Sequence, residues 1–311
     1  MKLFITGATG LVGRRLVEDR LRRGDQVVAL SRDGARARAL LGGDGAGGLL
    51  VVEGDPTTPG DWQERLVGLD AVIHLAGAGV AARRWTRQYK KTLVRSRTES
   101  TRLITSALEA APERPRTFIC ASAIGYYGER GDTPTDETAP AGTDFLARLA
   151  VEWEAQARAA EALSVRVVRL RIGVVLDPDG GALPKMAMPF RLLAGGPIGS
   201  GRQHLSWIHW RDLLGIIDLA LRDPRADGAF NATSPQPVTN RVFARTLGRV
   251  LRRPSWLVTP RFALRIVLGE LATYATMSQR IMPRRAQEHG YGFQYPDLEA
   301  ALAHCLRRNP K

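Results

Sequence analysis

A glycine-rich segment near the N-terminus has the residue types and the spacing that bind a dinucleotide. Gly7, Gly10 and Gly13 follow an apolar run at residues 2–6 and open an amphipathic stretch at residues 11–23. The first glycine permits a tight turn, the second lets the backbone approach a pyrophosphate at a helix N-terminus, and the third lets the helix pack closely on the strand. We expect cofactor contacts from Gly7, Thr9, Gly10, Leu11, Val12 and Gly13.

The residues that follow the next apolar run indicate which dinucleotide is bound. An NAD site usually ends this strand with a carboxylate that accepts hydrogen bonds from the adenosine ribose, whereas an NADP site presents small polar and basic residues to the 2′-phosphate. Here the run ends in Ser31 and Arg32, and Asp33 comes one position too late. The alternative is that Ser31 and Arg32 begin an ordinary solvated loop. The charge pattern favours NADP.

Two later segments complete the expected cofactor site. Asp55 follows the third apolar run, where its carboxylate could face the adenine amino group. Leu75, Ala76 and Gly77 follow the fourth run and would line the middle of the cofactor. Both segments come at the carboxyl ends of expected parallel strands, which is where ligands bind in open α/β sheets.

A parallel sheet is needed to bring these residues together. Over the first 170 residues, short β-branched runs alternate with helical patterns, as in sheets built from strand–helix–strand units. Expected strands cover residues 2–6, 26–31, 49–53, 71–75, 117–122 and 165–170, and expected helices cover residues 11–23, 87–111 and 145–162. The pattern predicts an α/β fold, a Rossmann-type doubly wound parallel sheet with a smaller, mostly helical C-terminal substrate lobe.

The pattern changes after residue 170 to loops rich in Gly and Pro, then a helix at residues 210–222 and a mostly helical remainder. We expect an NADP-binding Rossmann domain at residues 1–170, to which residues 205–232 return. The substrate lobe and the C-terminal helical domain would occupy residues 171–204 and 233–311.

Motifs along the whole chain are similar to those of one family. They lie at residues 7–13, 30–32, 74–77, 84–85, 121–128, 153–154, 195–201, 207–209 and 290–293. On these motifs the sequence resembles the extended short-chain dehydrogenase/reductases, and more narrowly the YfcH-like epimerase family, NAD-dependent epimerase/dehydratases with their own C-terminal helical domain. The resemblance implies an NADP-binding, oxidoreductase-like protein. One segment departs from the family pattern: Ala78 and Gly79 stand where Glu-Asn is usual, so a polar contact from that glutamate to the cofactor is lacking.

The catalytic residues that the resemblance implies are only partly present. Most short-chain dehydrogenases use a serine after the fifth strand and a Tyr-x-x-x-Lys pair, in which lysine lowers the pKa of the tyrosine. Ser122 is well placed for the serine role. Phe145 and Leu149 occupy the places of the pair, and no Tyr-x-x-x-Lys occurs anywhere in the sequence.

Three replacements for the missing pair can be weighed. Tyr126 or Tyr127 could supply a phenol from the loop after Ser122, or these rings could pack under that loop. Glu154 could face the nicotinamide ribose, where it would contribute to both catalysis and cofactor binding, or it could be a solvated helix carboxylate. His209, between two tryptophans, could catalyse or bind substrate, although a lone histidine before a helix more often caps and packs.

A second glycine-rich loop is expected on the substrate side. Gly199 allows close approach of the backbone, and Arg202 could hold an anionic group of the substrate. The alternative is a surface turn with a solvated arginine. Two cations of the long helix, Lys91 and Arg97, are interpreted as surface charges.

Composition limits the partners and the compartment. The formal net charge is +14, but only five of the 45 basic residues are lysines, and the arginines are scattered in pairs. We therefore expect no nucleic-acid partner and no membrane partner, since no base-reading motif and no apolar run of spanning length accompanies the charge. Two cysteines form no metal-binding cluster, and the first residues do not resemble a secretory signal, so we predict no metal and a cytoplasmic monomer or homodimer.

These observations favour an NADP(H)-dependent oxidoreductase acting on a small carbonyl or hydroxyl substrate. The alternative is a sensor or scaffold that binds NADP(H) without turnover, because the Tyr-Lys pair is missing. A sugar-nucleotide epimerase is third, since it would need the same pair.

Overall fold

A seven-stranded sheet forms the centre of the fold in the computed structural model, which describes residues 1–43 and 46–306. Its strand order is β11-β7-β5-β4-β1-β2-β3, and β5, β4, β1, β2 and β3 pair in parallel. The strands are β1 (Lys2–Thr6), β2 (Gln26–Ser31), β3 (Leu49–Glu53), β4 (Ala71–His74), β5 (Thr117–Ala123), β7 (Arg166–Ile172) and β11 (Gly228–Ala232). The predicted Rossmann-type fold is confirmed, and β11 is a strand that the sequence analysis did not identify.

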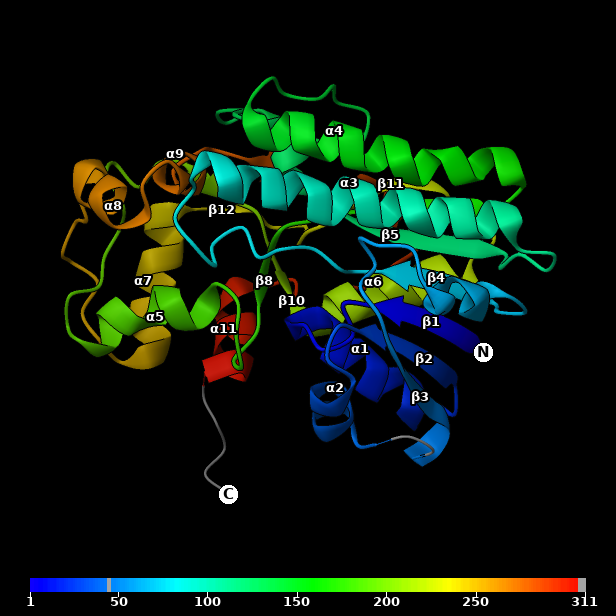
Figure 1. The fold of residues 1–311 in the computed structure, drawn as a ribbon. Coiled ribbons are helices and arrows are strands. Elements are labelled where there is room, and N and C mark those ends of the chain that lie inside the picture. The colour runs from blue at the N-terminus through cyan, green and yellow to red at the C-terminus, as the bar shows by residue number, and fades with distance from the viewer. Residues whose placement is uncertain (44–45, 307–311) are drawn as a thin grey trace. The chain divides into compact units, whose positions relative to one another are not determined.

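The sheet is buried on both faces, which explains the nearly continuous apolar strands. Leu3, Phe4 and Ile5 of β1 have no exposed surface, and neither have the first three residues of β4. Figure 1 shows α3 and α4 on one face of the sheet and α1 on the other. The helices connected with the sheet are α1 (Leu11–Arg22), α2 (Gly34–Leu41), α3 (Arg87–Ala110), α4 (Phe145–Arg158) and α6 (Trp210–Arg222), with 3-10 turns η1 (Ala46–Gly48), η2 (Asp61–Leu66) and η4 (Ala159–Leu163).

The chain divides into two compact units. The first, here the sheet unit, comprises Met1–Ser122, Arg148–Leu170 and Ile217–Ala229. The second unit comprises Ala123–Ala147, Arg171–Ile216 and the chain from Phe230 onward. The functional assignment of a cofactor domain and a substrate lobe stays a prediction.

The second unit is built from helices and short strand pairs around its own apolar core. The strand pairs are β10 with β8, β12 with β9 and β13 with β6. Trp207, Phe243 and Leu302 are central to the core, and each is at most 2 % exposed. The elements are β6 (Pro134–Thr135), β8 (Val174–Leu176), β9 (His204–Leu205), β10 (Trp207–His209), β12 (Val238–Thr239), β13 (Arg280–Ile281), η3 (Ile124–Tyr127), α5 (Leu183–Arg191), α7 (Asn240–Leu251), α8 (Arg261–Leu268), α9 (Leu271–Ala275), α10 (Arg284–Glu288) and α11 (Leu298–Leu306).

Among the residues that the structure describes, none of the helices combines the length and the apolar character required to cross a membrane.

Candidate functional site

The glycine loop between β1 and α1 has no room for side chains at two of its three glycines. Gly7 has φ +67°, and a Cβ there would lie 2.7 Å from the carbonyl carbon of Leu75. A Cβ at Gly13 would lie 2.1 Å from the Gly7 carbonyl oxygen, because α1 packs directly against the loop. The loop therefore needs these glycines for its own geometry.

The N-terminus of α1 is open toward an anion. Gly10 occupies the N-cap position and makes no side-chain cap, and the first turn of α1 has no acidic residue. Unpaired N–H groups and the positive end of the helix dipole attract a phosphate at such a place. Thr9, Leu11 and Val12 are half-buried around this N-terminus.

The end of β2 was predicted to determine which dinucleotide is bound, and the nearby carboxylate of Asp33 caps the next helix, α2. Asp33 is the N-cap of α2, and its Oδ1 accepts a hydrogen bond of 2.8 Å from the Arg36 N–H. Ser31 Oγ donates to the Asp33 carbonyl oxygen at 3.1 Å, and the Arg32 side chain is exposed. Asp33 is thus committed to the helix, while Ser31 and Arg32 occupy the end of β2.

The Asp55 side chain stabilises the loop in which it lies. Its Oδ1 accepts hydrogen bonds from the Thr57 N–H and the Thr57 hydroxyl, both at 2.8 Å. The carboxylate is half-buried. This turn fixes the position of Asp55 after β3, and the other carboxylate oxygen is not used in it.

Arg97 lies beside the segment after β4, and the expectation of a surface charge is wrong. Its side chain is only 9 % exposed, its guanidinium donates to the carbonyl oxygens of Ala78 (2.9 Å) and Leu93 (3.1 Å), and it lies over the Trp153 ring. A Cβ on Gly77 would lie 3.3 Å from the guanidinium carbon. Burial lowers the pKa of Arg97 to about 10.

His74 precedes the same segment, and the sequence analysis assigned it no role. Thr6 Oγ1 lies 2.6 Å from its Nδ1, and Ser100 Oγ lies 3.0 Å from its Nε2. Complete burial, assisted by the charge of Arg97, lowers the pKa of His74 to about 3. The imidazole is therefore neutral at physiological pH, and it ties β4 to β1 and α3.

Ser122 and Glu154 come together in the sheet unit. Ser122 Oγ donates to Glu154 Oε1 at 2.7 Å, and Arg169 Nη1 lies 3.7 Å from Glu154 Oε2. Ser122 and Glu154 are 3 % and 4 % exposed, so Glu154 is not a solvated carboxylate. The serine that was expected to orient a substrate oxygen is thus coupled to a buried carboxylate with a nearby cation.

The two tyrosines of the second unit have different surroundings. Tyr127 is fully buried, donates to Asn231 Oδ1 at 2.7 Å and accepts from Arg171 Nη1 at 2.9 Å. Burial raises the pKa of Tyr127 to about 12. Tyr126 is half-buried, with the Arg171 guanidinium 3.5 Å from its ring centroid. Burial and these two hydrogen bonds favour a packing role for Tyr127, and Tyr126 is the more exposed of the two phenols.

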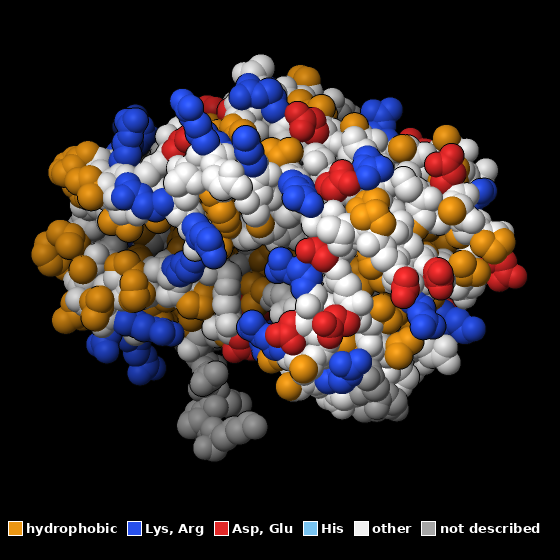
Figure 2. Space-filling model, viewed as in Figure 1, with side chains coloured by type: hydrophobic (Ala, Val, Ile, Leu, Met, Phe, Trp, Pro, Cys, Tyr) orange, Lys and Arg blue, Asp and Glu red, His pale blue; other side chains and the backbone are white. Residues whose placement is uncertain are grey.

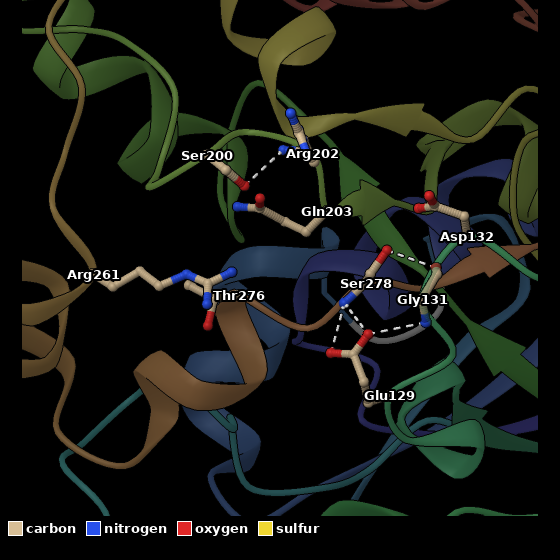
Figure 3. Close-up of a pocket in the computed structure, with 9 residues that line it drawn as sticks. All are labelled: Glu129, Gly131, Asp132, Ser200, Arg202, Gln203, Arg261, Thr276 and Ser278. Atoms are coloured by element: carbon tan, nitrogen blue, oxygen red, sulfur yellow. Dashed lines mark hydrogen bonds between the residues drawn. The ribbon is translucent and has the colours of Figure 1, made fainter.

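A polar cavity of about 350 Å³ lies in the second unit, as Figure 3 shows. Arg202 is one of its lining residues and is exposed, whereas Gln203 is buried and donates to the Ile198 carbonyl oxygen. The Gln203 Oε1 atom is buried with no hydrogen-bond partner among the described residues. Gly199, with φ +57°, holds the loop in a left-handed turn beside Arg261, another lining residue. The cavity thus offers guanidinium donors, a carbonyl acceptor and the carboxylates of Glu129 and Asp132.

His209 is buried in the second unit among aromatic rings. Its Nδ1 accepts from the Arg211 N–H at 3.2 Å, so Nε2 carries the ring proton and donates to His304 Nδ1 at 3.0 Å. The ring stacks on Tyr295, with centroids 3.9 Å apart. His304 and Cys305 bring three ligand-type atoms within 4.8 Å, but a protonated Nε2 does not suit a metal ion.

The sheet, the glycine loop and the strand-end residues define a class of protein, and comparison with known families agrees. Residues 3–233 match the model of the NAD dependent epimerase/dehydratase family, which is more than half of the chain. Residues 259–305 match a domain of unknown function, DUF1731. The chain belongs to the NAD-dependent epimerase/dehydratase family.

Particular members of the family are similar over nearly the whole chain. The Arabidopsis thaliana protein "Epimerase family protein SDR39U1 homolog, chloroplastic" is 40% identical over 305 residues, which cover 97% of this chain and 86% of the relative. Bacillus subtilis YfhF is 37% identical, with 98% of each chain covered. The crystal structure of human SDR39U1 (isoform2) with NADPH has a TM-score of 0.85 and 33% identity, and covers 99% of both chains. The predicted resemblance is confirmed.

Proposed function

We propose that this chain binds NADP(H) through the sheet unit and acts as an oxidoreductase on a small carbonyl or hydroxyl substrate. The glycine loop and the open N-terminus of α1 would hold the pyrophosphate, and Ser31 and Arg32 would hold the 2′-phosphate. Asp55 would face the adenine, and Leu75, Ala76 and Gly77 would line the middle of the cofactor. NADPH in the structure of human SDR39U1 supports the choice of cofactor. When bound, the nicotinamide supplies or accepts a hydride.

The sheet unit contains two buried guanidinium groups with different surroundings, and one of them, Arg97, supports an anionic ligand at this place. Arg20 is 1 % exposed and lies within 3.6 Å of carboxylates of Asp19, Asp25 and Asp218. No carboxylate among the described residues forms an ion pair with Arg97, although it too is buried. A buried cation without a counter-charge is costly, by several kcal/mol. We infer that an anionic part of the cofactor lowers this cost.

Two substitutions with opposite expected effects on stability test the proposed role of Arg97. Arg97→Met should leave the stability of the free protein unchanged or higher, because an unpaired buried charge is removed, and should weaken NADPH binding by about tenfold. Arg20→Met should lower stability, because three carboxylates lose their partner. Thermal unfolding and fluorescence titration with NADPH measure both effects. If Arg97→Met destabilises the free protein as much as Arg20→Met does, the inference is wrong.

The buried Ser122–Glu154 pair is the observation that carries the proposed chemistry. During reduction, Ser122 would donate its hydroxyl proton to the substrate oxygen, while Oγ receives a proton from the Glu154 carboxyl group. During oxidation the proton would move in reverse, from the substrate hydroxyl through Ser122 Oγ to Glu154. A positioned acid or base contributes about 100- to 10,000-fold to a rate. Glu154 would thus replace the missing tyrosine as the final proton store.

The cavity of Figure 3, where two arginines and the carboxylates of Glu129 and Asp132 meet, supports a polar substrate whose anionic group would lie at Arg202. Arg202 and Arg261 offer charged donors, and the unsatisfied Gln203 Oε1 needs a donor, such as a substrate hydroxyl. Gly199 would allow close approach. His209 is proposed to support this part of the second unit through packing.

Enzyme variants test the reaction directly. We would measure NADPH oxidation with small aldehydes, ketones and quinones for the wild type and for Ser122→Ala, Glu154→Gln and Tyr126→Phe. The first two variants should lose at least about 100-fold in kcat while NADPH affinity persists. Thr105→Val, which removes a buried hydroxyl bonded to the Gln156 carbonyl oxygen, is the matched control. Undiminished turnover in Ser122→Ala and Glu154→Gln would contradict the proposed site.

A non-catalytic NADP(H) sensor or scaffold is the second candidate. It is favoured by the missing Tyr-x-x-x-Lys pair and by the Ser122 hydroxyl, which already has an acceptor. Tight NADPH binding without turnover of any tested substrate class would support it. A sugar-nucleotide epimerase is less favoured, since it needs the same pair. The cytoplasmic location, the state as monomer or homodimer and the lack of a nucleic-acid partner stay predictions.

A further inference from the structure

The second unit exposes large apolar side chains that the sheet unit does not. Trp256, Phe262, Ile266 and Val267 are 69–72 % exposed, and Leu192 is 71 % exposed. In the described part of the sheet unit, no large apolar side chain is more than 44 % exposed. None of the eight residues of α8 is buried, so this helix lies on the surface of its unit.

The exposed apolar side chains belong to two adjoining segments. The Leu257 N–H donates to the Gly195 carbonyl oxygen at 3.2 Å, and the Thr259 N–H donates to the Pro197 carbonyl oxygen at 2.9 Å. These bonds place the chain before α8 beside the chain after α5. Figure 2 shows apolar side chains gathered over α8 and the neighbouring loop, with basic side chains around them. We call Leu192, Leu193, Trp256, Phe262, Ile266 and Val267 the apolar surface.

The charges around the apolar surface are mainly positive, and the exposed Glu270, just after α8, is an exception. Residues 228–269 contain seven arginines and no Asp or Glu, and residues 180–211 also contain no acidic residue. Arg191, Arg252, Arg253 and Arg265 are exposed, and no ion pair joins them to any described carboxylate. In the sequence, each of these arginines lies within four residues of a member of the apolar surface. The excess of arginines favours a partner that is both apolar and anionic.

We propose that the apolar surface docks on a membrane that carries anionic phospholipids. On α8, Phe262 and Ile266 are four residues apart and Arg261 and Arg265 form the adjoining row, so one face presents apolar and cationic side chains together. Aromatic and aliphatic groups at the acyl boundary, with arginines at the phosphates, are typical of helices that lie in the interface. This docking is peripheral, and it replaces our expectation that the protein has no membrane partner.

Two other partners fit the surface less well. A second copy of this chain would bring two sets of arginines together, and like charges oppose such an interface. An acidic protein would need pockets for its side chains, whereas the apolar residues project from a helix and its adjoining loops. A bilayer requires no pocket, because the lipids adapt to the side chains that enter them.

Vesicle binding tests the proposal with the full-length protein. The wild type should co-sediment with vesicles of phosphatidylcholine and phosphatidylglycerol, and much less with phosphatidylcholine alone or at high salt. Ile266→Glu and Phe262→Glu should abolish binding. The combination of Arg191→Gln, Arg253→Gln and Arg265→Gln should weaken it by about 100-fold, at about fivefold for each arginine. Leu40→Glu, which changes an exposed apolar residue on α2, is the matched control and should bind as the wild type does.

Several outcomes would overturn the proposal. They are lack of binding to the mixed vesicles, equal binding to both kinds of vesicle, and binding that persists in Ile266→Glu and Phe262→Glu. A dimer that Ile266→Glu dissociates, without vesicle binding by the wild type, would assign the surface to a second copy. Unchanged thermal unfolding and NADPH affinity in the variants exclude misfolding as the reason for lost binding.

Discussion

Several ionisable side chains of the sheet unit are buried, whereas several large apolar side chains of the second unit are exposed. Arg20, Arg97, His74 and Glu154 are each at most 9 % exposed in the sheet unit, and each has hydrogen bonds or ion pairs. In the second unit, Phe262 and its neighbours are exposed around α8. Groups that must hold a defined position are fixed by burial, while a surface that adapts to a fluid partner needs no such support. The proposed cofactor site and the proposed membrane surface differ in this respect.

Glycines give the largest expected contrast between the units. Gly13→Ala in the sheet unit should lower the free energy of unfolding by about 1–3 kcal/mol and remove measurable NADPH binding, because its Cβ would overlap the Gly7 carbonyl oxygen. Gly292→Ala in the second unit has open space and should change stability by less than about 0.5 kcal/mol. Calorimetry and NADPH titration measure both variants. Equal effects would refute the idea that loop geometry distinguishes them.

The pH dependence of stability sharpens the comparison at buried His74. Its folded pKa of about 3 lies below the ordinary value of 6.5, so the unfolded chain takes up the proton first as the pH falls. Stability should therefore decrease from pH 6.5 toward pH 3, by up to about 1.4 kcal/mol per pH unit from this group. His74→Gln should remove this component in urea titrations. Parallel pH profiles for the wild type and the variant would contradict the burial argument.

Arg32, an exposed residue of the sheet unit, should affect the preference for NADPH over NADH more than it affects stability. Arg32→Ala should weaken NADPH binding by about 10- to 100-fold, which corresponds to the loss of a charge-assisted hydrogen bond of about 1.5–3 kcal/mol. NADH affinity and thermal stability should hardly change. Equal weakening of both cofactors would show that Arg32 does not contact the 2′-phosphate.

Two neighbouring tyrosines separate packing from catalysis in the second unit. Tyr127→Phe should cost about 1–3 kcal/mol of stability, because Asn231 and Arg171 each lose a buried partner, and kcat should be unchanged. Tyr126→Phe should leave stability nearly unchanged. Turnover that depends on Tyr127 and not on Ser122 would reverse this assignment.

The sequence could predict most of the sheet because its strands are short, apolar and followed by polar or glycine residues at their carboxyl ends. The glycine loop could be predicted because each glycine has a distinct geometric reason. The burial of Arg97 could not be predicted, because a charged residue in a long helix is usually exposed and nothing nearby in the sequence shows that its side chain is covered. The apolar surface was missed although residues 228–269 contain seven arginines and no acidic residue, because the sequence does not show which apolar side chains beside them stay exposed after folding.

The two helices that follow β1 and β2 begin in opposite ways. The N-terminus of α1 is uncapped, whereas α2 is capped by Asp33, and its Gly34 N–H also donates to Glu53 Oε2 at 3.1 Å. Evolution of NAD preference from this chain would not be a simple exchange of one side chain. Moving the carboxylate of Asp33 back to the end of β2 would remove the cap of α2. Replacing Ser31 with an acidic residue would place a third carboxylate beside those of Asp33 and Glu53. The proposed preference for NADP would therefore be protected by a local folding constraint, which would make neighbouring sequences with the opposite preference hard to reach.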